Sequence, residues 1–376
     1  MMKPSTTQDG MFKGSQLRLA RHYWGKTLND IAEDIDCTRQ YVSQLENGKG
    51  KLKLEDPITE RLAKSLEVTP TFFFKPVGVS LSEEQAHFRK LATTKASVKQ
   101  KVLARGTVFD QLVEYLDTKV KLPTVDFPDE SGAETAEEIE RAAERLRSYW
   151  GLGLGPIAHM VRVVERAGAV VAFFQDASTE VDALSIVSRR PVIVRNDAKQ
   201  SPFRLRFDIA HELGHLVLHE GQVTGDRKTE SEANRFASAF LLPRTTFIKA
   251  FPRRGTRLDW AGISNLKMDF QVSKAAILYR AKSLGLIDDY QYRGAIIYLK
   301  NRGENIEEKE DSYCIKEKAE TIPAALKVLR EHYGMDHVAL ANHLGVTSSF
   351  LAEIVPAPAE AAINLQPATQ GLRLVK

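Results

Sequence analysis

The sequence predicts a multidomain protein with an all-α N-terminal domain, an α+β central domain and a small helical C-terminal region. Two short amphipathic helix patterns joined by a tight turn predict the first domain. Apolar strand-like runs before a helix with two histidines predict the second, and a later helical pattern predicts the third. A length of 376 residues is enough for two to three domains. We place the segments at 12–78, 79–130, 131–300 and 301–376.

The first segment has the pattern of a compact helical domain with one polar helix face. Helices are predicted at 15–24, after Thr27, from Thr38 to Glu46 and at 55–66, and each threonine is placed to cap its helix. The helix after Thr38 directs apolar side chains to the core and polar ones outward. Its cap and outer arc are suited to contact bases and phosphates in a DNA major groove, through Thr38, Arg39, Gln40, Ser43, Gln44 and Asn47.

An ordinary helical bundle would also satisfy two short helices and a tight turn. The string from Gln44 to Lys49 favours DNA binding, and through it residues 13–74 resemble the XRE (phage repressor and Cro-like) helix-turn-helix family. The resemblance implies base contacts from Arg39, Gln40 and Gln44 to a double-stranded DNA operator. It also implies a homodimer that occupies two half-sites.

Two positions depart from that family. Leu28 stands where the family often has a Gln that binds phosphate, so one phosphate contact is in doubt. Asp36 replaces the usual Gly of the turn, but Asp tolerates a left-handed backbone better than most residues do. Neither departure changes the predicted fold.

The central segment contains a metal-binding pattern. Residues 207–219 are predicted as one amphipathic helix in which His211 and His215 share a face, because residues four apart on a helix are neighbours. Both imidazoles can then bind one Zn²⁺ while Glu212 faces a water on that ion. Such a triple arises by chance in about one chain in a hundred of this length, but the amphipathic context argues against chance.

A third metal ligand is expected downstream, where two carboxylates compete. At about 100° per residue, Glu230 lies on the side of Asn234 and the apolar residues of the next helix, whereas Glu232 points away. We therefore predict that Glu230 is a ligand, that Asn234 bonds to a ligand, and that Glu232 is a solvated surface charge. His219 either supports the metal ligands, contacts substrate or is a partly exposed helix end. Gly214 is expected to let the helix of Glu230 approach closely.

Residues of about 133–300 resemble the ImmA/IrrE metallopeptidase family. The resemblance rests on Arg206-Phe207, the core from His211 to His215, the stretch from Glu230 to Pro243, and the segment 271–287. It implies a zincin-like α+β fold, with Zn²⁺ bound by His211, His215 and Glu230 and with Glu212 as the general base. It also implies a narrow substrate class, namely other helix-turn-helix repressors.

Composition limits the remaining possibilities. A formal net charge of +4 is only mildly basic, so DNA affinity must come from local patches. One acid-free stretch, at 86–109, either contacts the DNA backbone or is a solvated helix face; its basic residues are Arg89, Lys90, Lys95, Lys99, Lys101 and Arg105. Cys37 and Cys314 form no metal or redox pattern and suit a reducing cytoplasm. Without a signal-peptide core or a bilayer-length apolar run, we expect a cytoplasmic protein with no membrane contact.

The remaining elements follow from hydrophobic period and from Pro and Gly positions. We expect helices at 108–120, 133–150 and 156–167, a linker at 123–131, and strands at 169–174, 183–187 and 191–195. A strand edge beside the metal helix would bind substrate as an added strand.

The last segment is predicted to consist of a charge-rich flexible connector at 300–320, a helix-turn-helix-like stretch at 338–351 and a loose tail from residue 356. The second helix of this stretch is the one that would contact DNA. Its exposed positions, which include Ser348, Ser349 and Glu353, offer no Arg, Lys or Gln. We interpret the stretch as a degenerate copy that serves packing or protein contact, or as a chance resemblance.

Two functions from different classes fit the sequence. In the first, a DNA-binding transcription regulator carries a zinc peptidase that cleaves a helix-turn-helix repressor, an antitoxin-like partner or itself in response to a signal. In the second, the peptidase-like domain is catalytically silent and senses a ligand or binds a partner protein. The presence of all four site residues favours the first.

Overall fold

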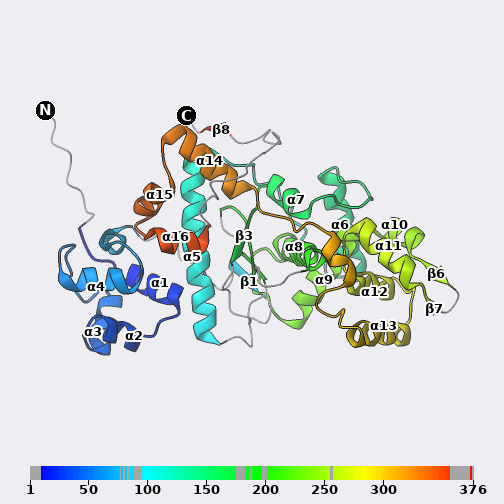
Figure 1. The fold of residues 1–376 in the computed structure, drawn as a ribbon, viewed down its shortest axis with the longest axis horizontal. Coiled ribbons are helices and arrows are strands. Elements are labelled where there is room, and N and C mark those ends of the chain that lie inside the picture. Colours follow the sequence, from blue (N-terminus) through cyan, green and yellow to red (C-terminus); the bar gives the residue numbers. More distant parts are fainter. Residues whose placement is uncertain are drawn as a thin grey trace. The chain divides into compact units, whose positions relative to one another are not determined.

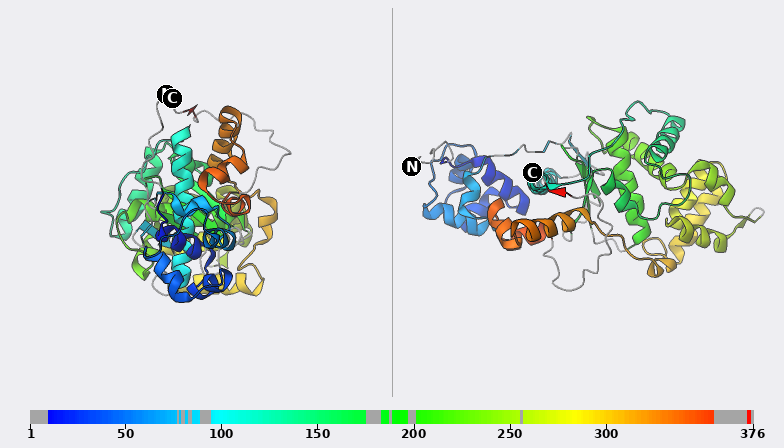
Figure 2. Two further views of the ribbon diagram at one scale, coloured as in Figure 1. Left: turned by 90° about the vertical axis from the view of Figure 1, so that its left-hand side faces the viewer. Right: turned by 90° about the horizontal axis from the view of Figure 1, so that it is seen from above.

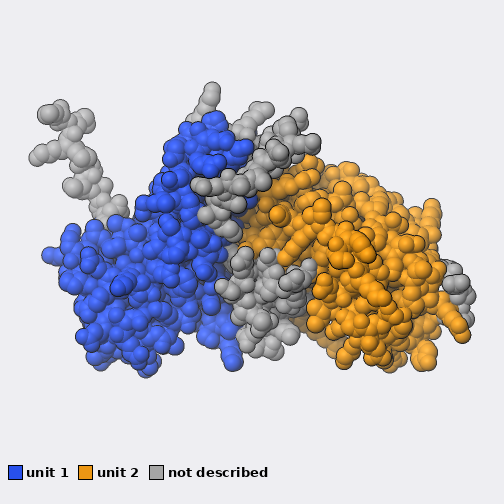
Figure 3. All heavy atoms as spheres, in the orientation of Figure 1, with its two compact units in different colours: residues 1–83, 93–122, 322–376 blue, residues 84–92, 123–321 orange. Residues whose placement is uncertain are grey.

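The computed structural model describes residues 10–76, 78, 81–82, 85–88, 95–174, 183–186, 189–196, 201–254, 257–355 and 373–374. The chain divides into two compact units, shown in Figure 3. One consists of residues 1–83, 93–122 and 322–376, and the other of residues 84–92 and 123–321. Among the described residues, every helix is too short or too polar to cross a bilayer.

The first unit begins with a small helical domain (Figure 1). Its elements are α1 (Gly14–Trp24), α2 (Leu28–Asp34), α3 (Arg39–Glu46), α4 (Pro57–Ser65) and the 3₁₀ helix η1 (Pro70–Phe74). Thr27 and Thr38 cap α2 and α3 through backbone N–H groups, as their positions predict. Asp36 takes the left-handed conformation (φ 54°) that the turn requires. Val42 and Leu45 are fully buried, which directs the polar arc of α3 outward.

Four segments that lie far along the chain complete this unit. They are the long helix α5 (Ala96–Lys119) and the C-terminal helices α14 (Thr321–Tyr333), α15 (His337–Leu344) and α16 (Ser348–Ile354). Strand β2 (Val120–Lys121) pairs with β8 (Arg373–Leu374). Helix α5 packs against α1, so most of the segment expected as an interdomain linker belongs to the first unit. Figure 2 shows the C-terminal helices beside the N-terminal ones.

The second unit contains a four-stranded sheet. Strands β1 (Ala86–Phe88), β3 (Val170–Phe174), β4 (Ala183–Ile186) and β5 (Val192–Asn196) lie in the order β1-β4-β5-β3. β3 and β5 are parallel, whereas β4 is antiparallel to both β5 and β1. The three predicted strands form within a residue of their expected bounds, except that Val187 lies outside the described residues. β1 was not expected, because its short run lies in the basic stretch.

The helices of this unit build most of its core. In chain order they are α6 (Ala136–Tyr149), α7 (Met160–Arg166), α8 (Pro202–Leu218), α9 (Arg227–Leu241), α10 (Arg244–Ala250), α11 (Trp260–Phe270), α12 (Lys274–Ser283) and α13 (Asp289–Asn301), with the 3₁₀ helix η3 (Lys309–Tyr313). The short strands β6 (Arg253–Arg254) and β7 (Arg257–Leu258) form a hairpin. Helices α8 and α9 share the most extensive contact, α6 packs on α9, and α7 and α8 pack against the four-stranded sheet. The second unit is therefore helix-rich with a small four-stranded sheet, consistent with the predicted central domain.

The charge-rich stretch expected as a flexible connector is packed into the second unit. The Lys267 ammonium is fully buried and lies 2.6 Å from a carboxylate oxygen of Glu308 and 2.5 Å from one of Asp311. Glu317 is also buried and binds Arg206. The expectation was wrong because buried cations of the second unit supply partners for these acids. Composition at 300–320 does not reveal those partners.

Another buried acid anchors the end of this stretch. The Glu165 carboxylate, on α7, accepts hydrogen bonds from the backbone N–H groups of Glu320 and Thr321. Burial raises the pKa of Glu165 to about 7, and these bonds only partly oppose the shift. The native state therefore holds a proton there that the unfolded chain releases near pH 4.5.

Candidate metal centre

The two helices that carry the site approach each other closely at Gly214. A Cβ added there would lie 3.2 Å from the Cα of Ala233 and 3.2 Å from the Cδ1 of Phe236, both on α9. Glycine costs helix stability, but even a Cβ at this point would press on α9, which would have to move by a few tenths of an ångström. The contact therefore follows the expectation for Gly214. It brings Glu230, in the first turn of α9, opposite the histidines of α8.

Three side chains converge between α8 and α9. The Nε2 atoms of His211 and His215 lie 3.1 Å apart, and each lies 3.4 Å from a carboxylate oxygen of Glu230. Their ligand atoms all fall within 4.8 Å of one another, and both histidines are buried. The structure thus brings together the three residues predicted as ligands, and this cluster can hold a metal ion.

Hydrogen bonds on the far side of each imidazole fix its tautomer. The His211 Nδ1 lies 3.0 Å from Oδ1 of Asn234, an acceptor, so Nδ1 carries the proton and Nε2 presents its lone pair. His215 Nδ1 lies 3.0 Å from Nδ1 of His219, whose Nε2 lies 3.0 Å from Oε2 of Glu232. Because the carboxylate accepts from His219 Nε2–H, His219 Nδ1 accepts from His215.

With Nδ1 protonated, each neutral imidazole presents an Nε2 lone pair on the side of the ring that faces Glu230. Two such lone pairs 3.1 Å apart repel each other unless a cation lies between them. Burial is the main cause that lowers the pKa of His215 to about 3, so protonation does not supply that cation. Burial raises the pKa of Glu230, but its contacts with His211 and His215 outweigh burial and hold that pKa well below its usual range, so Glu230 is a carboxylate. The cluster is neutral imidazole plus carboxylate, the form that ligates metal.

The prediction for Glu232 was wrong. Its side chain is only 14% exposed, and it is bound to His219, which is itself 3% exposed. Helical angle alone placed Glu232 on the outer face of α9. The end of α8 covers that face, and His219 reaches back to it. His219 accordingly bonds to His215, one of the predicted ligands, and is not an exposed helix end.

Glu212 lies beside the cluster and is held by a residue that the sequence did not indicate. The buried Ser185 hydroxyl, on β4, donates to Oε2 of Glu212 at 2.7 Å. Burial raises the pKa of Glu212 to about 7, although His211 and the Ser185 bond lower it. No local pattern could identify Ser185, because strand pairing and helix packing alone bring it to Glu212.

Residues 164–282 match the family model of the IrrE N-terminal-like domain, a peptidase M78 domain. The match begins within α7 and covers all four residues of the candidate site. It supports the ImmA/IrrE-like part of the sequence prediction over this range. No curated protein sequence matches the chain.

A hollow of about 300 Å³ lies beside the cluster of the IrrE-like domain. Asn234 and Tyr279 both line it, together with Asp208, whose carboxylate lies 2.6 Å from the buried Arg195. Tyr279 is thus placed near the cluster, since Asn234 bonds to His211. Arg206, one of the residues on which the family resemblance rests, is buried and is bound to Glu317 and to backbone carbonyls.

The sheet edge next to Glu212 is occupied by the chain itself. β4 carries Ser185, and its outer neighbour is β1, where His87 pairs with Ser185 and Ala86 with Ile186. The edge expected to bind an added substrate strand therefore already has one. β1 becomes the new edge of the sheet.

The predicted base-reading residues lie on the outer face of α3, in the other unit. Arg39, Gln40 and Gln44 are exposed, whereas Thr38 is engaged as the helix cap. Asn47 accepts from Arg18 at 2.9 Å and donates to the Ser43 carbonyl at 2.8 Å, so part of its bonding capacity is used. The sequence did not indicate Glu46, a buried carboxylate whose oxygens lie 3.3 Å from Arg18 and 2.6 Å from Arg21.

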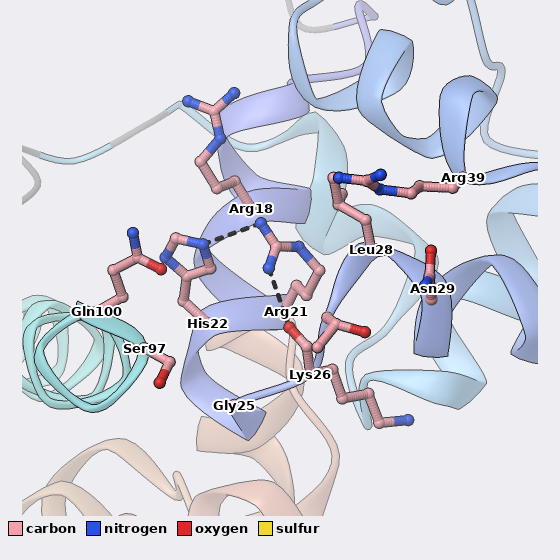
Figure 4. Close-up of a pocket in the computed structure, with 11 residues that line it drawn as sticks. Arg18, Arg21, His22, Gly25, Lys26, Leu28, Asn29, Arg39, Ser97 and Gln100 are labelled. Carbon is pink, nitrogen blue, oxygen red and sulfur yellow. Dashed lines mark hydrogen bonds between the residues drawn. The ribbon is translucent and has the colours of Figure 1, made fainter. Parts of the chain in front are cut away.

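A basic hollow of about 760 Å³ adjoins these helices (Figure 4). Arg18, Arg21, Lys26 and Arg39 line it, together with Leu28 at the start of α2 and two residues of α5. Leu28 thus lies among basic side chains that line the hollow but offers no polar group of its own. From the basic stretch of 86–109, Arg89 and Lys90 lie outside the described residues.

Proposed function

We propose that the IrrE-like domain is a zinc-dependent endopeptidase of narrow specificity, carried by a DNA-binding transcription regulator. The observation that supports it most is the convergence of His211, His215 and Glu230 beside a buried Glu212. Two donors each about 2.1 Å from a tetrahedral zinc ion lie about 3.4 Å apart. The three donor separations of 3.1, 3.4 and 3.4 Å fit that geometry.

Peptide hydrolysis assigns a role to each protein group. A zinc ion held by these ligands would polarise the peptide carbonyl and lower the pKa of a coordinated water. Glu212 takes a proton from the attacking water as its oxygen bonds to the carbonyl carbon, and then gives the proton to the departing amine nitrogen. The C–N bond breaks, and a carboxylic acid and an amine result. The Ser185 hydroxyl fixes the Glu212 carboxylate in position for both transfers.

For the substrate we propose an extended segment of a helix-turn-helix repressor, of an antitoxin-like partner, or of this chain. An extended peptide adds to an exposed strand edge through main-chain hydrogen bonds. Access to the β4 edge requires β1 to leave it. That occupied edge is also the one observation that favours the alternative function, in which the domain is silent and senses a ligand or partner.

For the first unit we propose sequence-specific binding of an operator in double-stranded DNA, by a homodimer whose α3 helices enter the major groove. The exposed Arg39, Gln40 and Gln44 support it, because Arg recognises guanine and Gln recognises adenine. The adjoining basic hollow is suited to a phosphate of the backbone. Both proposals fit a cytoplasmic protein.

The deciding experiment compares the wild type with Glu212→Gln in metal content and in cleavage of candidate repressors. We expect one zinc per chain in both proteins and cleavage only by the wild type. His211→Ala is the control that should lose the metal. Equal zinc with no cleavage by either protein would favour the silent-domain alternative. Absence of zinc from the wild type would contradict both proposed functions of the site, the active peptidase and the silent domain.

A further inference from the structure

The C-terminal helical pair repeats the sequence of a segment in the N-terminal domain. Residues 62–73 and 340–351 are identical at six of twelve positions: Leu62/Leu340, Ala63/Ala341, Leu66/Leu344, Val68/Val346, Thr69/Thr347 and Phe72/Phe350. The two segments also share one local structure. In each, a helix ends, a residue with positive φ follows (Glu67 at 54°, Gly345 at 78°), and a second short helix begins.

Matching backbone bonds close both turns. Val68 N–H donates to the carbonyl of Ala63 at 3.0 Å, and Val346 N–H donates to that of Ala341 at 3.0 Å. The two segments are therefore two copies of one helix–turn–helix-start motif. We call them the N-terminal copy (62–73) and the C-terminal copy (340–351).

The two copies bind each other reciprocally. Thr69 N–H of the N-terminal copy donates to the carbonyl of Gly345 at 2.8 Å, and Thr347 N–H of the C-terminal copy donates to that of Glu67 at 3.0 Å. Val68 and Val346 face each other between these bonds as an isolated antiparallel bridge. Equivalent donors thus reach equivalent acceptors, so the contact has local two-fold symmetry.

A contact of this kind is what an isologous dimer uses, in which one surface binds the same surface of a second copy. We propose that the N-terminal copy is the chain's own dimerisation surface. The C-terminal copy occupies it within one chain, in place of the N-terminal copy of a second chain. Release of the C-terminal copy would then allow two chains to pair through Val68 on the two-fold axis.

The side chains at the turn fit this exchange. In a dimer, Glu67 of the second chain would stand where Gly345 stands. A Cβ at Gly345 would lie 3.0 Å from the Lys75 ammonium, the far end of a flexible side chain, and 3.3 Å from the Phe72 Cα, which must give way by a few tenths of an ångström. A glutamate there would therefore meet a cation. Ser349 of the C-terminal copy donates to Oε2 of Glu67 at 2.9 Å, and Thr71, the equivalent hydroxyl, could do the same from a second chain.

Aromatic packing holds the C-terminal copy in place. The Phe350 ring stacks on Tyr23 with 4.2 Å between centroids and meets the edge of Trp24 at 5.5 Å. The ring is fully buried. A signal that withdraws Phe350 would therefore also uncover the N-terminal copy, which couples release to dimerisation.

Proline substitutions separate the intrachain contact from the dimer. Thr347→Pro removes the N–H that the C-terminal copy donates, at a φ of −76° that proline accepts, and leaves the N-terminal copy intact. We expect the full-length variant to shift from monomer to dimer mass in sedimentation. Thr69→Pro, at a φ of −84°, removes the N–H that is needed both for the contact within one chain and for the proposed contact between two chains. The double variant should therefore stay monomeric.

Cysteine cross-linking supplies a second measurement, in a background with Cys37 and Cys314 replaced by Ala. Facing residues of such a bridge have Cα atoms about 4.5 Å apart, within disulfide range. Val68→Cys with Val346→Cys should give an intrachain disulfide in the monomer. Val68→Cys with Thr347→Pro should give a disulfide between two chains.

Three results would overturn the inference. The first is a released chain that stays monomeric at all concentrations, although the thiol introduced by Val68→Cys reacts freely with a thiol reagent. The second is a dimer that persists in the double proline variant, since it would use another surface. The third is a C-terminal copy that stays docked both with Thr347→Pro and with Phe350→Asp, because the contacts described here would then not hold it.

Discussion

The bond between Asn234 and His211 allows a direct test of how the protein orients the proposed metal ligands. Asn234→Ala removes the acceptor that lies 3.0 Å from His211 Nδ1 and leaves the three ligands unchanged. Loss of such an orienting partner typically costs tenfold to a hundredfold in metal affinity. Asn234 lines the hollow beside the cluster, so water can replace the lost acceptor. We therefore expect the lower end, about tenfold, which corresponds to about 1.4 kcal/mol.

Competition between the protein and a chromophoric chelator for zinc measures this effect. Asn234→Asp is the matched variant, because a carboxylate at the same distance accepts the His211 proton at least as well. It should bind zinc as tightly as the wild type or more tightly. Unchanged affinity in Asn234→Ala, or equal losses in the Ala and Asp variants, would show that the bond does not fix the His211 tautomer.

Four further predictions follow from single contacts. Gly214→Val should lower the unfolding free energy by about 1–3 kcal/mol and weaken zinc binding. Gly294→Val, on α13 with open space around it, is the control and should do neither. Thermal melts and zinc titrations of both variants test this. The unfolding free energy should fall by up to about 3 kcal/mol as pH rises from 4.5 to 7, because native Glu165 keeps its proton until its folded pKa of about 7. Thermal melts across this pH range should show that dependence in the wild type, and it should be absent from Glu165→Gln. His87→Pro should free the β4 edge and raise cleavage of a repressor substrate several-fold, and an unchanged rate would place substrate elsewhere. Arg39→Ala should lose discrimination at one base pair by about 1–3 kcal/mol, so equal losses on all sequences in a binding assay would contradict base recognition.

The sequence predicted elements whose cause is local. The strands at 169–174, 183–187 and 191–195 follow from apolar β-branched runs, and the caps at Thr27 and Thr38 follow from the bonding of their own hydroxyls. The convergence of His211, His215 and Glu230 could be predicted because a helical period of 3.6 residues fixes which side chains share a face.

Contacts between distant segments could not be predicted in this way. Helical angle gives the direction of Glu232 but not what covers it, and here the end of α8 brings His219 to it. Ser185 meets Glu212 only because β4 pairs with β5 and packs on α8. The acids at 300–320 appeared solvated for the same reason, since Lys267 lies more than thirty residues earlier in the chain.

The hydrogen bonds of Asn234 to His211 and of His219 to His215 explain how the cluster of histidines and Glu230 can be buried. Neutral imidazoles and a carboxylate withdrawn from water lose hydration, and a lone pair without a proton or metal cannot recover it. Asn234 and Glu232 hold the Nδ1 protons of His211 and, through His219, of His215, so both Nε2 atoms are ready for an ion. A metal ion bound there would return the lost solvation, and its binding free energy would also stabilise the native fold. If the cluster binds the metal as proposed, a substitution that separates α8 from α9 at Gly214 should therefore weaken both metal binding and the fold.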